Sequence, residues 1–223
     1  MSSTILSTKI LSARQKDMLL SAHFQVVQYD AIKIVPLSFG VHTGNFDTLL
    51  ITSQNAFKTF IKSKTVKELP STQAFCVGEQ TKTLLESKGI QVIACAENAK
   101  KLGELIATEH VAKSFLFISG KQRLNQLPKM LDEKNIRYQE VHVYETLLTK
   151  KKFNRNFDGV LFFSPTAVES YFHQNSLANG IAFCIGSTTA KSAQKFTKNI
   201  IIANKPSIEN VIVQVVKKFN PYD

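Results

Sequence analysis

Short apolar runs alternate with amphipathic stretches along this chain. Mainly apolar runs such as residues 48–51, 74–77 and 160–163 are each followed by a stretch with apolar residues at helical spacing. A run of this kind is typical of a strand buried on both faces, as in a parallel sheet between two layers of helices. The pattern therefore predicts an α/β fold built on parallel sheets.

The predicted strands and helices follow one another from end to end. Strands are predicted at residues 4–7, 25–29, 31–36, 48–51, 74–77, 91–94, 114–118, 137–143, 160–163, 182–185 and 200–202. Helices are predicted at residues 12–22, 53–61, 80–88, 99–111, 122–134, 165–175, 187–196 and 207–219. Segment 141–146 alternates apolar and polar residues, and we expect it to pair with strand 31–36.

Part of the sequence is repeated. Residues 47–57 (DTLLITSQNAF) return as 158–168 (DGVLFFSPTAV), and residues 74–81 (AFCVGEQT) return as 182–189 (AFCIGSTT). In each copy an apolar strand leads through a turn bearing Ser, Thr or Gly into a helix. The repeat predicts two similar, flavodoxin-like α/β domains, each with several helix N-termini at one edge of its sheet.

The second copy has too few strands for a full sheet, and the missing ones are those at the N-terminus. We therefore predict a discontinuous domain, residues 1–35 plus 148–223, and an inserted domain, residues 37–138. Two parallel connectors, about residues 31–36 and 139–147, would join the domains as a two-stranded link. Such a double hinge allows the domains to move relative to one another.

The net charge favours an anionic partner. There are 28 Lys and Arg residues against 17 Asp and Glu, a formal charge of +11. The basic residues are scattered, which favours a small anionic molecule over a nucleic acid. We expect no membrane partner, because no apolar run approaches the roughly 20 residues of a membrane span. Residues 1–11 do not resemble a signal peptide, so a cytoplasmic location is expected.

The cysteines and histidines show no spacing typical of metal ligands. Cys76 and Cys184 occupy the same position in the two copies of the repeat, inside predicted strands. Free cysteine is among the most buried residue types, so both are predicted to be core residues. We expect no metal site.

The candidate chemistry lies in turns that lead from a strand into a helix. Glycine lets such a turn approach a ligand, and Ser or Thr caps the helix while still offering a hydroxyl. Open α/β sheets bind ligands at the carboxyl ends of their strands, and helix N-termini favour anions. Each turn taken alone is also explained by plain N-capping, worth about 1 kcal/mol. The candidate anion-binding residues are Thr52, Ser53, Asn55, Gly78, Thr81, Ser164, Pro165, Thr166, Gly186, Thr188, Thr189 and Ser207.

The order and spacing of the motifs resemble the uroporphyrinogen-III synthase family over essentially the whole chain. Ser119-Gly120 precedes Leu127-Pro128, and Gly89 follows the motif at residues 77–81 (VGEQT). The other motifs are residues 51–57 (ITSQNAF), 77–81 (VGEQT), 143–146 (VYET), 163–168 (FSPTAV), 185–190 (IGSTTA) and 205–207 (KPS).

The resemblance implies an enzyme that closes linear hydroxymethylbilane into uroporphyrinogen III, with loss of water and inversion of ring D. It implies two α/β domains joined by a two-stranded ladder, no metal or organic cofactor, and a substrate with eight carboxylates held by backbone amides and hydroxyls. We expect a monomer. Tyr144 matches the family tyrosine proposed to assist the leaving hydroxyl; packing in the connector ladder is the alternative role.

Some residues depart from the family pattern. Lys9 stands where many relatives have Arg, and Ser119 stands where relatives often carry Arg before the glycine that is Gly120 here. Lys121 and Arg123 are the candidates to supply that charge instead.

Two other functions stay open. A catalytically silent protein of the same fold would bind an anion or a tetrapyrrole without turnover, and no residue type here is diagnostic of catalysis. A nucleic-acid-binding module would use the +11 charge. It predicts a contiguous basic face and binding that weakens steeply with salt.

Overall fold

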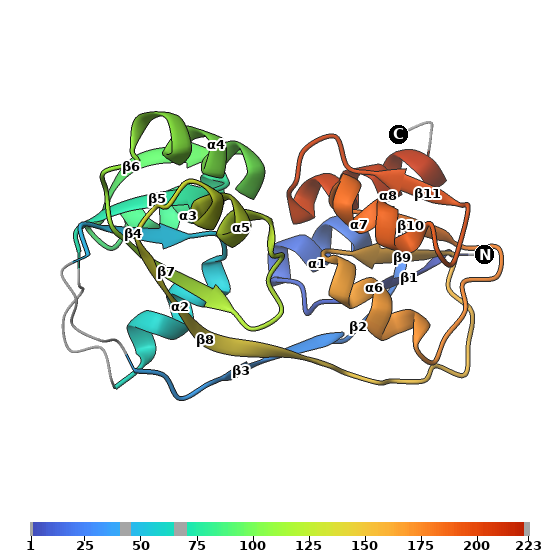
Figure 1. Ribbon diagram of the computed structural model, residues 1–223. Coiled ribbons are helices and arrows are strands. Elements are labelled where there is room, and N and C mark those ends of the chain that lie inside the picture. Colours follow the sequence, from blue (N-terminus) through green and yellow to red (C-terminus); the bar gives the residue numbers. More distant parts are fainter. Residues whose placement is uncertain (1, 41–45, 65–70, 221–223) are drawn as a thin grey trace. The chain divides into compact units, whose positions relative to one another are not determined.

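The computed structural model describes residues 2–40, 46–64 and 71–220. The chain divides into two compact units: unit 1 is Met1–Lys33 with Leu147–Asp223, and unit 2 is Ile34–Thr146. Each unit is a mainly parallel sheet with helices on both faces (Figure 1). The predicted α/β class with parallel sheets is confirmed.

Unit 2 is built on a six-stranded sheet in the order β3-β8-β7-β4-β5-β6. Helices α2 and α3 pack on the core that contains Leu49 and Ile51, whereas α4 and α5 pack on the core that contains Leu50 and Phe117. The strands are β3 (Ile32–Pro36), β4 (Thr48–Ile51), β5 (Gln73–Val77), β6 (Gln91–Ala96), β7 (Phe115–Gly120) and β8 (Tyr138–Leu148). The helices are α2 (Gln54–Lys62), α3 (Glu79–Glu86), α4 (Ala99–Glu109) and α5 (Gln126–Glu133).

Unit 1 is built on a five-stranded parallel sheet in the order β11-β10-β9-β1-β2. Helices α6 and α7 pack on the face that contains Leu6 and Val160, and α1 and α8 pack on the face that contains Ile5 and Leu161. The strands are β1 (Thr4–Ser7), β2 (Gln25–Gln28), β9 (Gly159–Phe162), β10 (Ile181–Cys184) and β11 (Ile200–Ile202). The helices are α1 (Ala13–Leu20), α6 (Pro165–Phe172), α7 (Ser187–Ala193) and α8 (Ile208–Phe219).

The two units are circular permutants of one another. Numbered along the chain, the strands of unit 1 have the flavodoxin-like order 2-1-3-4-5, whereas β4 to β8 of unit 2 have the order 3-2-1-4-5. If unit 1 is followed from β9 through β11 and then from β1 to β2, its order becomes that of unit 2. The repeat therefore extends beyond the segments seen in the sequence: residues 6–9 (LSTK) correspond to 118–121 (ISGK), and Tyr29-Asp30 corresponds to Tyr144-Glu145.

Three local expectations are corrected. The helix predicted from residue 122 begins at Gln126, because residues 121–125 form a turn. The segments predicted at 137–143 and 141–146 form one continuous strand, β8. The connectors were expected to be parallel, but β3 and β8 run antiparallel: the Leu37 amide donates to the Val143 carbonyl (2.9 Å), and the Thr149 amide donates to the Ala31 carbonyl (2.8 Å).

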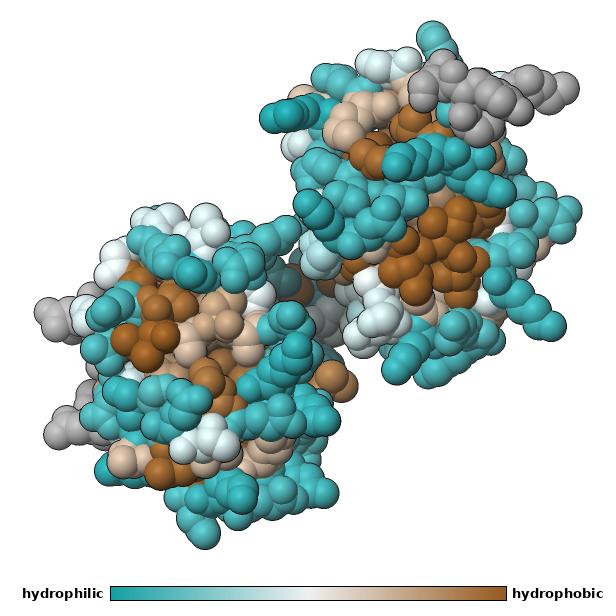
Figure 2. All heavy atoms as spheres, turned by 90° about the horizontal axis from the view of Figure 1, so that it is seen from above, coloured by the Kyte–Doolittle hydropathy of each residue, from teal (hydrophilic) through white to brown (hydrophobic). Residues whose placement is uncertain are grey.

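On the face that Figure 2 shows, hydrophilic side chains surround apolar ones that gather in patches on each unit. Leu124, Val111 and Ile10 are among the exposed large apolar residues. None of the helices in the described ranges is long and apolar enough to span a bilayer.

Candidate functional site

Strands β4 and β7 lie side by side in unit 2, and their connections leave toward opposite faces of the sheet. The chain after β4 enters α2 on one face, and the chain after β7 enters α5 on the other. Such a switch point opens a crevice outside the carboxyl ends of the two strands, where open α/β sheets bind ligands. Thr52 and Ser53 follow β4 at this point, and Gly120 and Lys121 stand at the end of β7.

A β-bulge directs Tyr144 toward this switch point. His142 of β8 lies opposite Ser119 of β7, but the next pair is Gly120 with Tyr144, so that β8 has one extra residue. A bulge interrupts the alternation of side chains and re-aims one of them. Val143 and Tyr144, although consecutive, both pack against the core under α2. The phenol of Tyr144 thereby reaches the N-terminus of α2, where its oxygen lies 3.2 Å from the Ser53 hydroxyl.

Gly120 makes room for the ring of Tyr144. A Cβ atom on Gly120 would lie 2.5 Å from Cζ and 2.8 Å from the hydroxyl oxygen of Tyr144, which is closer than carbon atoms approach. The backbone amide of Lys121 donates to the Tyr144 carbonyl at 2.9 Å, which fixes the strand end beside the ring. The structure thus brings together three predicted site residues: Ser53, Gly120 and Tyr144.

Unit 1 has the same frame without this pair. Thr8 stands where unit 2 has Gly120, and its hydroxyl donates to the Leu161 carbonyl at 2.6 Å. Tyr29, the counterpart of Tyr144, is 6 % exposed and packs edge-on against Phe153. Burial raises the pKa of Tyr29, and within the described residues its hydroxyl has no hydrogen-bond partner. The repeat therefore supplies two tyrosines, of which only Tyr144 reaches a helix cap.

Arg123 is already paired inside unit 2. Its Nε donates to Glu140 Oε1 at 2.7 Å, and its second nitrogen completes an ion pair with the same carboxylate. The buried hydroxyl of Ser119 also donates to Glu140 (2.6 Å) and contacts His142 Nδ1 (2.8 Å). Burial alone would raise the pKa of Glu140, but the hydrogen bonds from Arg123 and Ser119 lower it. Arg123 thus anchors the turn after β7, a role that the sequence did not indicate.

Glu140 and Gln122 were missed by the sequence analysis. The amide of Thr146 donates to Gln122 Oε1 at 2.8 Å, so the turn after β7 is held on β8 by side chains as well as by backbone. The sequence contained one sign of the role of Glu140. Residues two apart in a strand share a face of the sheet, which places Glu140 beside His142 in β8. Lys121 is the exposed cation of the turn, 3.6 Å from Glu145.

The serine turns are engaged as helix caps. The hydroxyls of Ser53, Ser164 and Ser207 accept from backbone amides of the first turns of α2, α6 and α8, at 3.4, 3.1 and 3.2 Å. Each hydroxyl keeps its own proton, which it can donate to an anion. Pro165 occupies the first turn of α6, where its missing N–H is not needed.

The two glycine turns of the repeat are different from the serine turns. No side chain caps α3 after Gly78 or α7 after Gly186, and a Cβ at either glycine would meet nothing within 4 Å. The first-turn amides of these helices are therefore presented at the carboxyl edge of each sheet without a side-chain acceptor. Amides in this position attract anions.

The remaining candidates differ in exposure. Thr81 and Thr189 are 5 % and 3 % exposed, so their side chains are buried, which the sequence did not indicate. Thr52 and Thr166 are half-buried. The side chains of Lys9, Asn55 and Thr188 are exposed at or near the carboxyl ends of their strands.

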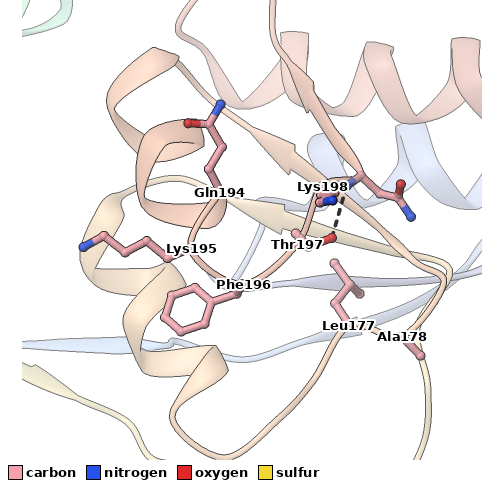
Figure 3. Close-up of a pocket in the computed structure, with 8 residues that line it drawn as sticks. Leu177, Ala178, Gln194, Lys195, Phe196, Thr197 and Lys198 are labelled. Carbon is pink, nitrogen blue, oxygen red and sulfur yellow. Dashed lines mark hydrogen bonds between the residues drawn. The ribbon is translucent and has the colours of Figure 1, made fainter.

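Two hollows in the surface of the described residues lie away from these candidates. One of about 450 Å³ in unit 1 is lined by residues 177–178 and 194–199, which precede β10 and β11 and so lie at the amino ends of the strands (Figure 3). There the Thr197 hydroxyl accepts from the Asn199 amide at 3.1 Å. Another, of about 290 Å³, lies between β3 and α2. Neither contains a predicted site residue, and the described residues include no cluster of three or more His, Cys, Asp or Glu suited to a metal.

Comparison with known proteins gives the same family throughout. The family model of uroporphyrinogen-III synthase HemD matches residues 16–212. The porphyrin biosynthesis protein HemD of Ruminiclostridium josui is 23 % identical over 251 residues, 97 % of this chain and 50 % of that protein, so this chain spans half the length of that relative. The uroporphyrinogen-III synthase of Chlorobaculum parvum is 24 % identical over 200 residues, 77 % of this chain and 80 % of that protein.

A solved structure shares the fold. The crystal structure of uroporphyrinogen-III synthetase from Helicobacter pylori matches with a TM-score of 0.74 at 20 % identity, covering 98 % of this chain and 100 % of that one. At that identity the likeness concerns the fold, whereas the family model matches most of the sequence. This chain belongs to the uroporphyrinogen-III synthase family.

Proposed function

We propose that this chain is a uroporphyrinogen-III synthase, which cyclises hydroxymethylbilane with loss of water and inversion of ring D. The observation that carries the proposal is the phenol of Tyr144, which lies at a strand switch point within 3.2 Å of the Ser53 hydroxyl in a chain of this family. A phenol at such a place is a proton donor within reach of a bound ligand.

The reaction begins at the hydroxymethyl group of the substrate. Its C–O bond breaks, the oxygen takes a proton from Tyr144 and leaves as water, and electrons of the pyrrole form the electrophilic azafulvene. The substituted carbon of ring D attacks this centre and gives a spiro intermediate, which fragments and recloses with ring D inverted. The proton released as the last ring regains aromaticity restores the phenol. The protein contributes positioning and charge stabilisation.

Candidate sites for substrate carboxylates are the turns at the carboxyl edge of the sheet within each unit. The first-turn amides after Gly78 and Gly186 are the best candidates, because no side chain occupies them. The protons of Ser164 and Ser207 and the exposed cations Lys9 and Lys121 are further candidates. The formal charge of +11 supports attraction of a substrate with eight carboxylates.

The test is to supply the purified protein with freshly made hydroxymethylbilane and to separate the oxidised products by chromatography. Without an enzyme the bilane closes to isomer I. The proposal expects predominant isomer III in an amount that depends on protein concentration. Isomer I alone from folded protein would overturn it.

The two other functions are separated by binding measurements. A silent binding protein would take up uroporphyrinogen without changing the isomer ratio. A nucleic-acid-binding module would bind an oligonucleotide with an affinity that falls steeply with salt. The pairing of Ser53 with Tyr144 favours the enzyme over both, since neither binding function needs a phenol at the switch point.

We further propose that the enzyme acts as a monomer in the cytoplasm. Cys76, Cys95 and Cys184 are free, which is typical of proteins from reducing compartments. Burial raises the pKa of Cys76 and of Cys184 to about 12, so these thiols stay protonated and unreactive. Light scattering after gel filtration should give a mass near 24.9 kDa; a mass of twice that value would contradict the monomer.

A further inference from the structure

We infer that Ser53 is a positioning residue for Tyr144: it orients the phenol and stabilises the phenolate that forms when Tyr144 gives up its proton. The inference rests on the proposed function. Among the residues that the structure describes, the Tyr144 hydroxyl lies 3.2 Å from the Ser53 hydroxyl, which is itself the N-cap of the nine-residue helix α2.

The hydrogen bonds around Ser53 limit what its hydroxyl can do. A serine hydroxyl has one proton and two acceptor positions. The Ala56 amide uses one acceptor position at 3.4 Å. When Ser53 donates its proton to the oxygen of Tyr144, the phenol proton is directed away from Ser53 and is available to the substrate.

The same arrangement has a larger effect once the proton has moved. In the dehydration step the substrate becomes a cation and Tyr144 becomes an anion. Ser53 then donates to a charged oxygen, and hydrogen bonds to charged groups are roughly twice as strong as neutral ones. The N-terminus of α2 adds positive potential at the same place. Because both effects grow as charge develops, they lower the barrier more than they strengthen substrate binding.

Unit 1 shows that the fold alone does not require this contact. It has a serine cap at the equivalent helix, Ser164, and a tyrosine at the equivalent strand, Tyr29. Thr8 replaces Gly120 there, and the Tyr29 hydroxyl finds no partner among the described residues. In unit 2 the contact is accompanied by a glycine, Gly120, where unit 1 has Thr8.

The alternative role of Ser53 is to bind a substrate carboxylate, as the sequence suggested. The two roles differ in measurable ways. A carboxylate ligand contributes to substrate binding whether or not Tyr144 has its hydroxyl. A positioning residue loses its effect when that hydroxyl is removed.

A double-mutant cycle tests the inference. Steady-state kcat and KM for isomer III are measured for wild type, Ser53→Gly, Tyr144→Phe and the double variant. Glycine is a good N-cap without a hydroxyl, so Ser53→Gly keeps the helix start. We expect kcat to fall by about 10- to 100-fold with little change in KM, somewhat less than for loss of an ideal oxyanion donor. In the Tyr144→Phe background the same substitution should change kcat less than twofold.

Two control variants distinguish the role of Ser53 as hydrogen-bond donor to Tyr144 from its role as N-cap of α2. Ser53→Thr keeps a hydroxyl and should restore most of kcat. Asn98→Ala removes a cap of similar geometry, that of α4, where the Asn98 side chain accepts from the Lys101 amide at 3.0 Å. This variant should lose stability but keep kcat and KM.

The outcomes are distinguishable. Equal losses from Ser53→Gly in both backgrounds, or a rise in KM with unchanged kcat, would overturn the inference and leave the proposed function intact. Wild-type protein that yields only isomer I would overturn the proposed function and the inference with it. A loss that is confined to the background with an intact tyrosine supports both.

Discussion

Gly120 determines where the ring of Tyr144 can lie. An added methyl group would lie 2.5 Å from Cζ of the ring, so the phenol or the strand end beside it has to move from its place next to Ser53. Gly120→Ala should therefore lower kcat for isomer III by about 100-fold or more, as expected for loss of a general acid. Steady-state kinetics on hydroxymethylbilane measure this effect.

The stability of the same variant provides a second check. Overpacking at a close contact destabilises a protein by about 1–3 kcal/mol. Urea unfolding of Gly120→Ala should show such a loss relative to wild type. In the Tyr144→Ala background, Gly120→Ala should cause no such loss, because the ring that the methyl group would overlap is absent. Normal kcat in Gly120→Ala would mean that the ring position is not essential.

Glu140 is expected to stabilise unit 2 in a pH-dependent manner. Its carboxylate bonds to Arg123 and Ser119, and these bonds hold its pKa below the value in the unfolded chain, about 4.3. The stabilisation is thus fully present above about pH 5 and is lost as the pH falls through the folded-state pKa. Glu140→Gln should unfold more easily than wild type by about 1–3 kcal/mol at pH 7.

Unfolding at several pH values tests this assignment. The difference in unfolding free energy between wild type and Glu140→Gln should shrink toward acid pH. A difference that stays constant from pH 7 to pH 3 would show that the charge of Glu140 is not the source of stability.

At the scale of elements, the two glycine turns have similar sequences but different backbones. Gly78 has a φ of 84°, which side chains disfavour, whereas Gly186 has a φ of −172°, which any residue adopts. Gly78→Ala should cost about 1–2 kcal/mol of stability, and Gly186→Ala should leave stability unchanged or slightly higher. The pair serves as its own control in urea unfolding, and equal losses would contradict the difference in backbone.

The apolar pattern predicted most of the elements because buried parallel strands and amphipathic helices have clear sequence periods. The start of α5 was predicted four residues too early. The side chains of Gln122 and Arg123 form hydrogen bonds with β8, and the sequence of residues 122–125 gives no sign of these bonds. The antiparallel connectors were missed since alternation specifies a strand but not its direction.

The residues of the candidate site were predictable one by one, but their contact was not. Ser53 followed from a turn and Tyr144 from a family resemblance. Plain alternation puts Tyr144 on the opposite face from Val141 and Val143, away from Ser53. A single extra residue in β8 reverses this, and such a bulge leaves no signature in the alternating sequence.

At the scale of the molecule, each unit has a core on both faces of its own sheet. Unit 2 is continuous in sequence, so a fragment of residues 34–146 should fold cooperatively by itself. In unit 1, β1 and β2 come from the N-terminal segment, and β1 lies between β9 and β2. Removal of residues 1–33 should therefore unfold unit 1 and leave unit 2 folded.

Circular dichroism and urea titration of the two truncated chains check this division. A fragment 34–146 that lacks a cooperative transition would contradict the independence of unit 2. A chain without residues 1–33 that keeps both transitions would contradict the permuted arrangement of unit 1.

The most direct test of the whole account is the isomer composition of the product as protein concentration is raised, compared between wild type and Tyr144→Phe. The account predicts that wild type turns freshly made hydroxymethylbilane into isomer III in proportion to its concentration, and that Tyr144→Phe does so at least about 100-fold more slowly, as expected for loss of a general acid. Isomer I at every concentration of folded wild-type protein would contradict it.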